Sequence, residues 1–451
     1  MGESRRWLTV LLSILLFLGG LSNSALAQTG ESGDSGEDSG DLDGEDEQQD
    51  LTSNQTMLDI TATVPSWRVG DSWTYAVTID ARSMVEDVDD FEGASLEIMT
   101  GTANMTVGAV TMLDDNGKMV PAYRLDLVAN GEGAGTFPDP YLGVLASGDL
   151  VGLITETKWL RVSDLAIIER VQTVDLDFRF VGLTIDVAEF THSHFYDPAQ
   201  ELYDFPLARN DSWVNVVNHS QEYSGDSGPI DFDDGDLYEE MILKSAVTGP
   251  GAGPHVYSGC EDSTNVTANY TNGDAYEYRW WCPAVNNFVY WWTDDMLLDG
   301  ADGVFALTGY FPAAAPNITV ETRVVNRSAP LNSNFTVQVN ISGGDGSLVT
   351  GELWLLGANW SFNTTGNSIN LTIPSGNLMD DSPTATDWAT HGVVVCLNGT
   401  DPEALECSVD TLTIAGSSKG YLLRERTILR MLPLSEVGLW ATNHLASSIR
   451  V

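Results

Sequence analysis

The chain has 451 residues, of which 65 are acidic and 20 are basic, so its formal net charge at pH 7 is −45. A charge this negative repels nucleic acid and anionic lipid surfaces, and we expect neither as a partner. The hydrophobic fraction of 43% is ordinary, and the length leaves room for two or three folded domains.

The first 27 residues have the three parts of a secretory signal peptide. Arg5 and Arg6 give a positive start, an apolar run from Trp7 to Leu21 follows, and Ala25-Leu-Ala27 is an A-x-A cleavage site. We therefore expect residues 1–27 to be removed and the mature chain to be secreted or held at the cell surface. An uncleaved N-terminal segment that anchors the chain in the membrane is the alternative.

Residues 28–57 are expected to form a disordered acidic linker. Within them, residues 29–50 contain ten acidic side chains and no aromatic one. Such a segment cannot bury enough apolar surface to offset the entropy lost on ordering. The acid-rich composition, with only four lysines, resembles that of proteins from salt-adapted or marine archaea.

Four cysteines fall as two local pairs, Cys260 with Cys282 and Cys396 with Cys407. Their spacings lack the C-x-x-C pattern of zinc sites, and an even number of cysteines in an exported chain indicates disulfides. We expect both local pairs to be bridged.

Asparagines that begin an N-x-S/T sequon are unusually frequent, and their number favours glycosylation in an exported chain. The fourteen sequon asparagines are Asn54, Asn104, Asn210, Asn218, Asn265, Asn269, Asn317, Asn326, Asn334, Asn340, Asn359, Asn363, Asn370 and Asn398. Incidental sequons in a threonine-rich β-protein are the other interpretation.

Residues 58–311 show the period-two alternation that is typical of half-buried strands. Examples are Trp73 to Ile79, Ala103 to Met112 and Met119 to Val128, the last two joined by a hairpin loop at 113–118 that contains a glycine. Helical periodicity is weak, and only Tyr141 to Leu150 is expected to hold a turn or two of helix. The pattern predicts a mainly β protein with one large antiparallel curved sheet or half-barrel domain.

Three short motifs in this region resemble a family of uncharacterised exported proteins. They are Trp67-Arg-Val-Gly-Asp-Ser-Trp-Thr-Tyr75, Phe205-Pro-Leu-Ala-Arg-Asn-Asp-Ser-Trp213 and Tyr278-Arg-Trp-Trp-Cys-Pro-Ala-Val-Asn-Asn-Phe-Val289. The set is similar to half-barrel domains related to the bacterial lipoprotein carriers, whose concave sheet holds an apolar ligand. That family has no catalytic residues to carry over. The chain departs from its pattern at Cys282, where serine is usual, and at Asn286 or Asn287, where glycine is common.

Two further segments complete the chain. After an Ala/Pro linker at 312–316, residues 317–415 contain about seven short strands separated by turns, which predicts an immunoglobulin-like β-sandwich. Residues 416–451 are richer in basic residues and are expected to be a short helix or a disordered tail.

Three clusters have residue types that can carry chemistry, but each has a simpler structural explanation. Gly225-Asp-Ser-Gly-Pro229 resembles a serine-protease loop but also suits a turn. His192 and His194 share one face of a strand, where two histidines on a solvated face are commoner than a metal site. Asp231-Phe-Asp-Asp-Gly-Asp236 does not match the EF-hand spacing, so it predicts weak calcium binding at most. We assign no catalytic residue, no metal ligand and no cofactor.

The highest local density of aromatic residues lies in two expected strands, and a hairpin turn at 283–287 would bring these strands side by side. Their candidate ligand-binding residues share strand parity in two sets, Tyr276, Tyr278 and Trp280 in one and Phe288, Tyr290 and Trp292 in the other. Such a wall lines an apolar or carbohydrate pocket, or it fills the core.

These features predict an exported cell-surface glycoprotein with a binding or structural role, holding an apolar or carbohydrate ligand in the large β domain. An extracytoplasmic hydrolase and a lipid carrier are the alternatives. A cell-surface polymer and other surface proteins are the partners that suit such a chain.

Overall fold

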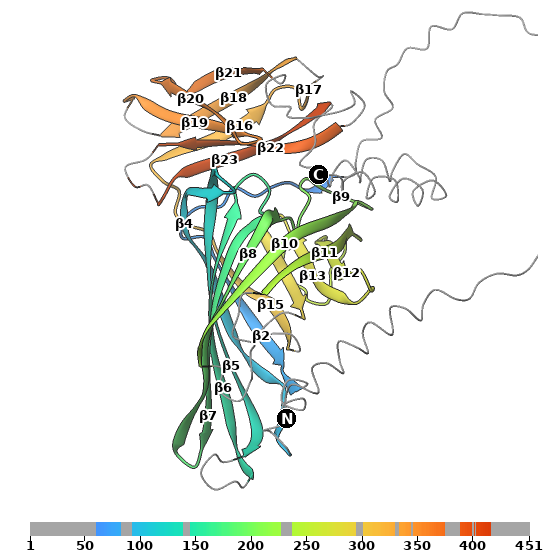
Figure 1. The fold of residues 1–451 in the computed structure, drawn as a ribbon. Helices are drawn as coiled ribbons and strands as arrows, with labels where there is room; N and C mark the ends of the chain where they lie inside the picture. Colours follow the sequence, from blue (N-terminus) through green and yellow to red (C-terminus); the bar gives the residue numbers. More distant parts are fainter. Residues whose placement is uncertain are drawn as a thin grey trace, which may run out of the picture. The chain divides into compact units, whose positions relative to one another are not determined.

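The computed structural model describes residues 60–82, 93–138, 145–226, 237–294, 301–329, 333–343, 346–374, 388–398, 401 and 403–415 (Figure 1). The expected signal peptide, the acidic linker up to residue 57 with Asn54, the acidic cluster Asp231 to Asp236 and the tail 416–451 lie outside these residues, as does Ser227. All of the secondary-structure elements of the described part are β-strands, which confirms the mainly β fold class.

Thirteen strands form one antiparallel sheet. They are β2 (Ser72–Asp80), β3 (Ser95–Leu96), β4 (Met99–Asp115), β5 (Lys118–Pro138), β6 (Leu145–Arg161), β7 (Ile167–Phe180), β8 (Leu183–Gln200), β10 (Ser212–Asp226), β11 (Leu237–Val247), β12 (Thr264–Tyr270), β13 (Ala275–Cys282), β14 (Asn287–Thr293) and β15 (Asp302–Phe311). The short strands β1 (Ile60–Ala62) and β9 (Leu207–Ala208) pair separately.

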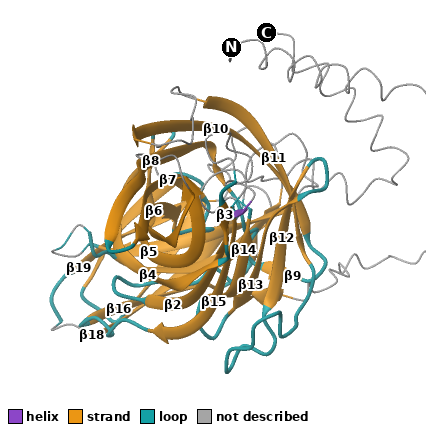
Figure 2. Ribbon diagram, turned by 90° about the horizontal axis from the view of Figure 1, so that it is seen from below, coloured by secondary structure: helices purple, strands orange, loops and turns teal. Residues whose placement is uncertain are grey.

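The sheet closes on itself. Successive long strands pair with one another along the chain, β15 returns to pair with β2, and β5 pairs with both β4 and β6. The predicted large curved sheet is therefore confirmed, and the pairing of β5 with β6 makes it a closed sheet of twelve strands with β3 attached to β5. Figure 2 shows β4 to β8 rolled tightly together, while β12 to β15 run side by side as a flatter wall.

Alternation of side chains explains why these segments form strands around one core. In β2, Trp73, Tyr75, Val77 and Ile79 are buried inside the closed sheet, and the residues between them are partly or fully exposed. Burial of large apolar side chains on one face contributes most of the stability of such a sheet. The two-residue loop of Asn116 and its neighbouring glycine joins β4 to β5, as the sequence predicts.

The second domain is a sandwich of two sheets. One contains β16 (Ile318–Val324), β18 (Asn334–Gly343) and β21 (Ser368–Pro374). The other contains β17 (Ser328–Ala329), β23 (Glu406–Ala415), β22 (Trp388–Leu397), β19 (Val349–Leu355) and β20 (Ala358–Thr364). Buried residues of both sheets form one core, and this arrangement is immunoglobulin-like.

The sandwich packs directly against the large sheet. Val110 of β4 exchanges backbone hydrogen bonds with the segment before β23, at 2.8 Å to Glu403 O and 3.0 Å from Leu405 N. The Arg68 guanidinium pairs with Glu406 at 3.2 Å, and Gly392 of β22 lies against the backbone of Ser163. Backbone hydrogen bonds, an ion pair and a close backbone contact thus join the two domains.

One expectation about local structure is wrong. Of the segment expected to hold a helical turn, residues 141–144 lie outside the described residues, and Leu145 to Leu150 are the start of β6 and pair with β5. The cross-strand hydrogen bonds override a weak helical pattern. Within the described residues, no helix has the length and apolar character needed to cross a membrane.

Candidate functional site

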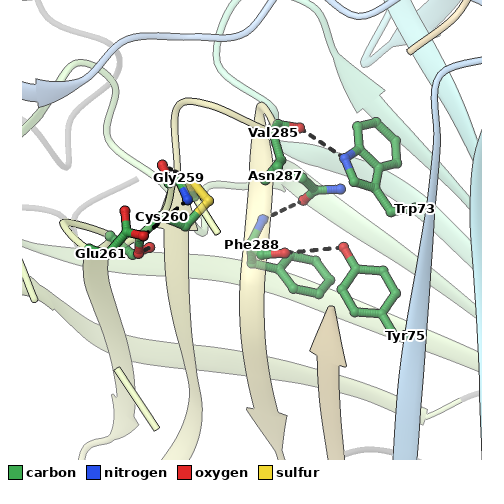
Figure 3. Close-up of a disulfide and its surroundings, with 10 residues drawn as sticks. Trp73, Tyr75, Gly259, Cys260, Glu261, Val285, Asn287 and Phe288 are labelled. Atoms are coloured by element: carbon green, nitrogen blue, oxygen red, sulfur yellow. Dashed lines mark hydrogen bonds between the residues drawn. A yellow bond between two sulfur atoms is a disulfide. The ribbon is translucent and has the colours of Figure 1, made fainter. Parts of the chain in front are cut away.

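The aromatic hairpin, β13 and β14, contains the third motif and is held in place by residues of the opening motif. Trp73 Nε1 donates to Val285 O at 2.9 Å, and Trp67 Nε1 donates to Asn286 O at 2.8 Å. The Tyr75 hydroxyl donates to Phe288 O at 3.2 Å (Figure 3). Because indole and phenol groups need partners when buried, these bonds join β2 to the hairpin turn.

The middle motif packs on the same hairpin. The ring of Phe205 meets Trp281 edge-to-face with centroids 5.3 Å apart, and Tyr203 meets Trp281 at 5.2 Å. The predicted disulfide between Cys260 and Cys282 is present at the end of β13. The hairpin is therefore fixed at its turn, on its inner face and by a covalent link.

The six predicted ligand-binding residues divide into two groups. Tyr278, Trp280, Tyr290 and Trp292 lie half-buried on the outer face of the closed sheet. Tyr276 and Phe288 are buried, at 5% and 4% exposure. The prediction that each set of three shares a face is therefore wrong for these two residues.

Irregular pairing explains the split. The register shifts between Ala268 and Asn269 of β12, close to Tyr276, and again between Trp280 and Trp281 of β13. A bulge of this kind adds a residue to one strand and changes which side chains share a face. Phe288 consequently stacks on Tyr75, with ring centroids 5.0 Å apart.

The outer residues form a stacked row, which we call the aromatic row and define as Tyr290, Tyr278 and Trp292. Tyr278 lies between the other two, with centroids 5.1 Å from Trp292 and 5.9 Å from Tyr290, both at an interplanar angle of 15°. Burial and the hydrogen bond with Tyr290 raise the pKa of Tyr278 to about 12. Its protonated hydroxyl is thus engaged in a hydrogen bond within the aromatic row.

The neighbours of the aromatic row on the adjacent strands are short side chains. Ala306 lies opposite Tyr290 and Val304 opposite Trp292 on β15, and Thr267 lies opposite Tyr278 on β12. Trp280 stands slightly apart, because the loop at Gly251 and Gly253 packs against its ring. The outer face therefore presents coplanar rings beside short side chains, an arrangement on which a flat ligand can stack.

The inside of the closed sheet contains a charged cluster that sequence reasoning missed. Glu156 and Lys158 of β6 form an ion pair of 2.8 Å, and Glu156 also pairs with Arg170 of β7. Burial alone raises the pKa of Glu156, but the two cations outweigh it and hold the pKa at about 2. Burial and the nearby Arg170 and Arg279 outweigh Glu156 at Lys158 and lower its pKa.

The cluster reaches across the interior to the aromatic hairpin. Lys158 Nζ lies 5.0 Å above the Trp291 ring, and Arg279 lies 4.9 Å from the same ring. Arg279 also pairs with Glu277 at 2.7 Å and donates to the Tyr203 hydroxyl at 3.1 Å. At this level, side chains from opposite walls fill the inside of the sheet.

His192 and His194 belong to the same interior, at 3% and 2% exposure, so the expectation of a solvated face is wrong. His194 Nδ1 lies 2.9 Å from His219 Nε2, and His192 Nε2 lies 2.9 Å from the Gln221 side-chain oxygen. Burial lowers the pKa of His194, and the positive field of its neighbours lowers it further. The described residues contain no group of His, Cys, Asp or Glu arranged to hold a metal ion.

A signal for this interior was present in the sequence. Glu156 and Lys158, and likewise Arg170 and Gln172, occupy alternate positions whose neighbours of the same parity are apolar. Polar pairs at inward parity on adjacent strands indicate a buried network that must be satisfied within the fold.

The sequons can be placed on the surface. All thirteen sequon asparagines in the described residues are exposed or half-buried, including Asn104 and Asn363 on strands. Two buried asparagines, Asn215 and Asn287, are not in sequons. The second predicted disulfide, Cys396 to Cys407, is also present and links β22 to β23.

Comparison with known proteins gives no relative from which to transfer a function. No family model matches the chain, and a search of curated proteins finds no match.

Proposed function

We propose that this chain is an exported cell-surface glycoprotein that binds a carbohydrate through the aromatic row. The observation that carries the proposal is the stack of Tyr290, Tyr278 and Trp292, half-buried on an outer sheet face beside short side chains. Sugar rings present apolar C–H faces that stack on aromatic rings and hydroxyls that bond to polar neighbours. A cell-surface polymer is the partner of this class that suits an exported chain.

The filled interior supports this role over lipid carriage. A carrier needs an apolar cavity that accepts an acyl chain, whereas the described interior contains Lys158, Arg279 and Glu277 packed around Trp291. Displacing such a network would leave buried charges unpaired, which costs several kcal/mol. The outer face offers binding without that cost.

Surface sequons support the cell-surface part of the proposal. Three of them, Asn334, Asn340 and Asn370, lie on strands β18 and β21 of the sandwich. Sugars at these three positions would lie on the sandwich, whereas sugars at Asn265 and Asn269 of β12 would lie beside the aromatic row. Peptide mass spectrometry of protein from its own organism tests occupancy, and bare asparagines throughout would contradict the glycoprotein assignment.

The binding role is tested with Trp292→Ala in affinity electrophoresis against a series of soluble neutral and acidic polysaccharides. We expect the wild type to be retarded and the variant to bind at least about fivefold more weakly, because loss of a large aromatic contact commonly costs about 1–3 kcal/mol. Phe311→Ala is the matched control, since Phe311 is an exposed aromatic at 59% that lies outside the row. The proposal is rejected if no polysaccharide retards the wild-type protein, or if Trp292→Ala and Phe311→Ala lose affinity equally.

A further inference from the structure

Three two-residue hairpin turns in this protein share one backbone conformation. Their first residues, Asn116, Val181 and Leu356, have φ of 53°, 47° and 52°, and each is followed by a glycine with positive φ. The flanking residues pair directly in all three hairpins. Turns of this kind favour asparagine, aspartate or glycine at the first position, and a β-branched residue there is strained.

The three turns differ in what compensates the first residue. Asn116 is the residue type that the turn prefers. Leu356 is disfavoured, but its side chain packs against the core of the sandwich. Val181 is both β-branched and 93% exposed, so neither backbone preference nor burial accounts for it. A side chain that weakens the turn and is buried by none of the described residues points to a contact outside them.

Val181 is accompanied by further exposed apolar side chains. Leu183, which follows the same turn, is 59% exposed, and Leu145 at the start of β6 is 52% exposed. The two segments are adjacent, because Asp149 of β6 pairs with Arg179 just before the turn. We call Leu145, Val181 and Leu183 the apolar tip. Figure 1 shows the ends of β5, β6 and β7 extending away from the shorter strands of the sheet.

The size of the apolar tip decides what it contacts. Three side chains offer roughly 300 Å², well below the roughly 800 Å² per partner that a stable protein interface needs. Insertion among lipid headgroups requires no complementary surface and gains from each apolar side chain removed from water. The net charge of −45 opposes approach to an anionic surface.

We propose that the apolar tip inserts into the surface of a lipid bilayer whose headgroups are uncharged or zwitterionic. This contact uses a different part of the sheet from the aromatic row and does not depend on carbohydrate binding. It would hold the closed sheet at a membrane surface through its hairpin ends.

A labelling experiment tests the insertion directly. All four cysteines are in disulfides, so Val181→Cys can be labelled selectively with a polarity-sensitive fluorophore, and Asn116→Cys is the control with the same turn geometry. On adding phosphatidylcholine vesicles, we expect a blue shift and at least a twofold rise in emission at 181 and no change at 116. No change at 181, or an equal change at both sites, overturns the proposal. If the emission at 181 shifts to the blue as protein concentration rises in the absence of vesicles, the apolar tip contacts a second copy of the chain, and the proposal is also overturned.

A substitution separates binding from folding. Val181→Asn combined with Leu183→Gln, which creates no N-x-S/T sequon, should reduce the fraction of protein that sediments with phosphatidylcholine vesicles at least fivefold. The same variant should melt at the same or a higher temperature, because asparagine suits the turn better than valine. Replacing a third of the lipid with phosphatidylserine should weaken wild-type binding. Unchanged sedimentation of the variant would refute the proposal.

Discussion

Glu156→Gln should destabilise the large sheet strongly at neutral pH. Glu156 is 4% exposed and neutralises Lys158 and Arg170, two cations that the fold also buries. The glutamine keeps the shape but removes the charge, so both cations lose their shared partner. Breaking a buried pair in this way costs more than the pair itself contributes, because an unpaired charge remains.

The pKa of Glu156 gives the magnitude. It falls from an ordinary 4.5 to about 2, since the two cations outweigh the opposing effect of burial. A pKa difference of one unit corresponds to about 1.4 kcal/mol, so the carboxylate contributes about 3 kcal/mol. In a domain of this size that loss lowers the melting temperature by roughly 6–12 °C.

The pH dependence checks the cause. A carboxylate with a lowered pKa stabilises the folded state fully above its ordinary pKa of 4.5, and this stabilisation is lost as the pH falls towards about 2. Thermal denaturation of wild type and variant should therefore differ most above pH 5 and converge between pH 4.5 and 2. Glu189→Gln, on the exposed face of β8, should change little at any pH. Equal stability of wild type and Glu156→Gln at pH 7, or a pH-independent difference, would refute the reasoning.

Two further predictions concern the sandwich. Gly392→Ala should lower the melting temperature and weaken the contact between the domains, because the new Cβ would lie 2.2 Å from Ser163 O. Gly366→Ala is the control, since its new Cβ would meet no atom closer than 3.7 Å. Equal melting temperatures of the two variants would contradict the contact. Replacing Cys396 and Cys407 by alanine should cost about 2–3 kcal/mol by the loop-entropy estimate, measured by urea denaturation, and an unchanged midpoint would show that the bridge adds nothing.

Local signals in the sequence predicted the local structure well. Period-two alternation predicted the strands, the glycine-containing loop before Lys118 predicted a hairpin, and cysteines close together in the chain predicted both disulfides. Each of these depends on residues close together in the chain. Closure of the sheet depends on how long strands tilt and meet, as in the pairing of β2 with β15 from Asp80 with Asp302 to Ser72 with Phe311, and no local pattern specifies that.

The site was harder to predict because burial is decided by distant strands. His192 and His194 looked solvated, since nothing near them in the chain showed that His219 would lie beside them inside the sheet. Two register shifts moved Tyr276 and Phe288 away from the outer rings, and period-two counting cannot detect a bulge. The prediction that these two residues bind ligand would therefore require an opening from the core, whereas the aromatic row is already at the surface.

The opening motif positions the hairpin that carries the proposed binding residues. Trp67 and Trp73 satisfy carbonyl groups of the hairpin turn that are distant in sequence, and the bridge at Cys282 fixes the neighbouring strand end. A hairpin held in this way presents Tyr278 and Trp292 in one arrangement before any ligand arrives. Because ordering side chains on binding costs free energy, a row that is already ordered retains more of its stacking energy as affinity. The buried tryptophans near the start of the large sheet thus act as positioning residues for the rings that we propose to contact the sugar.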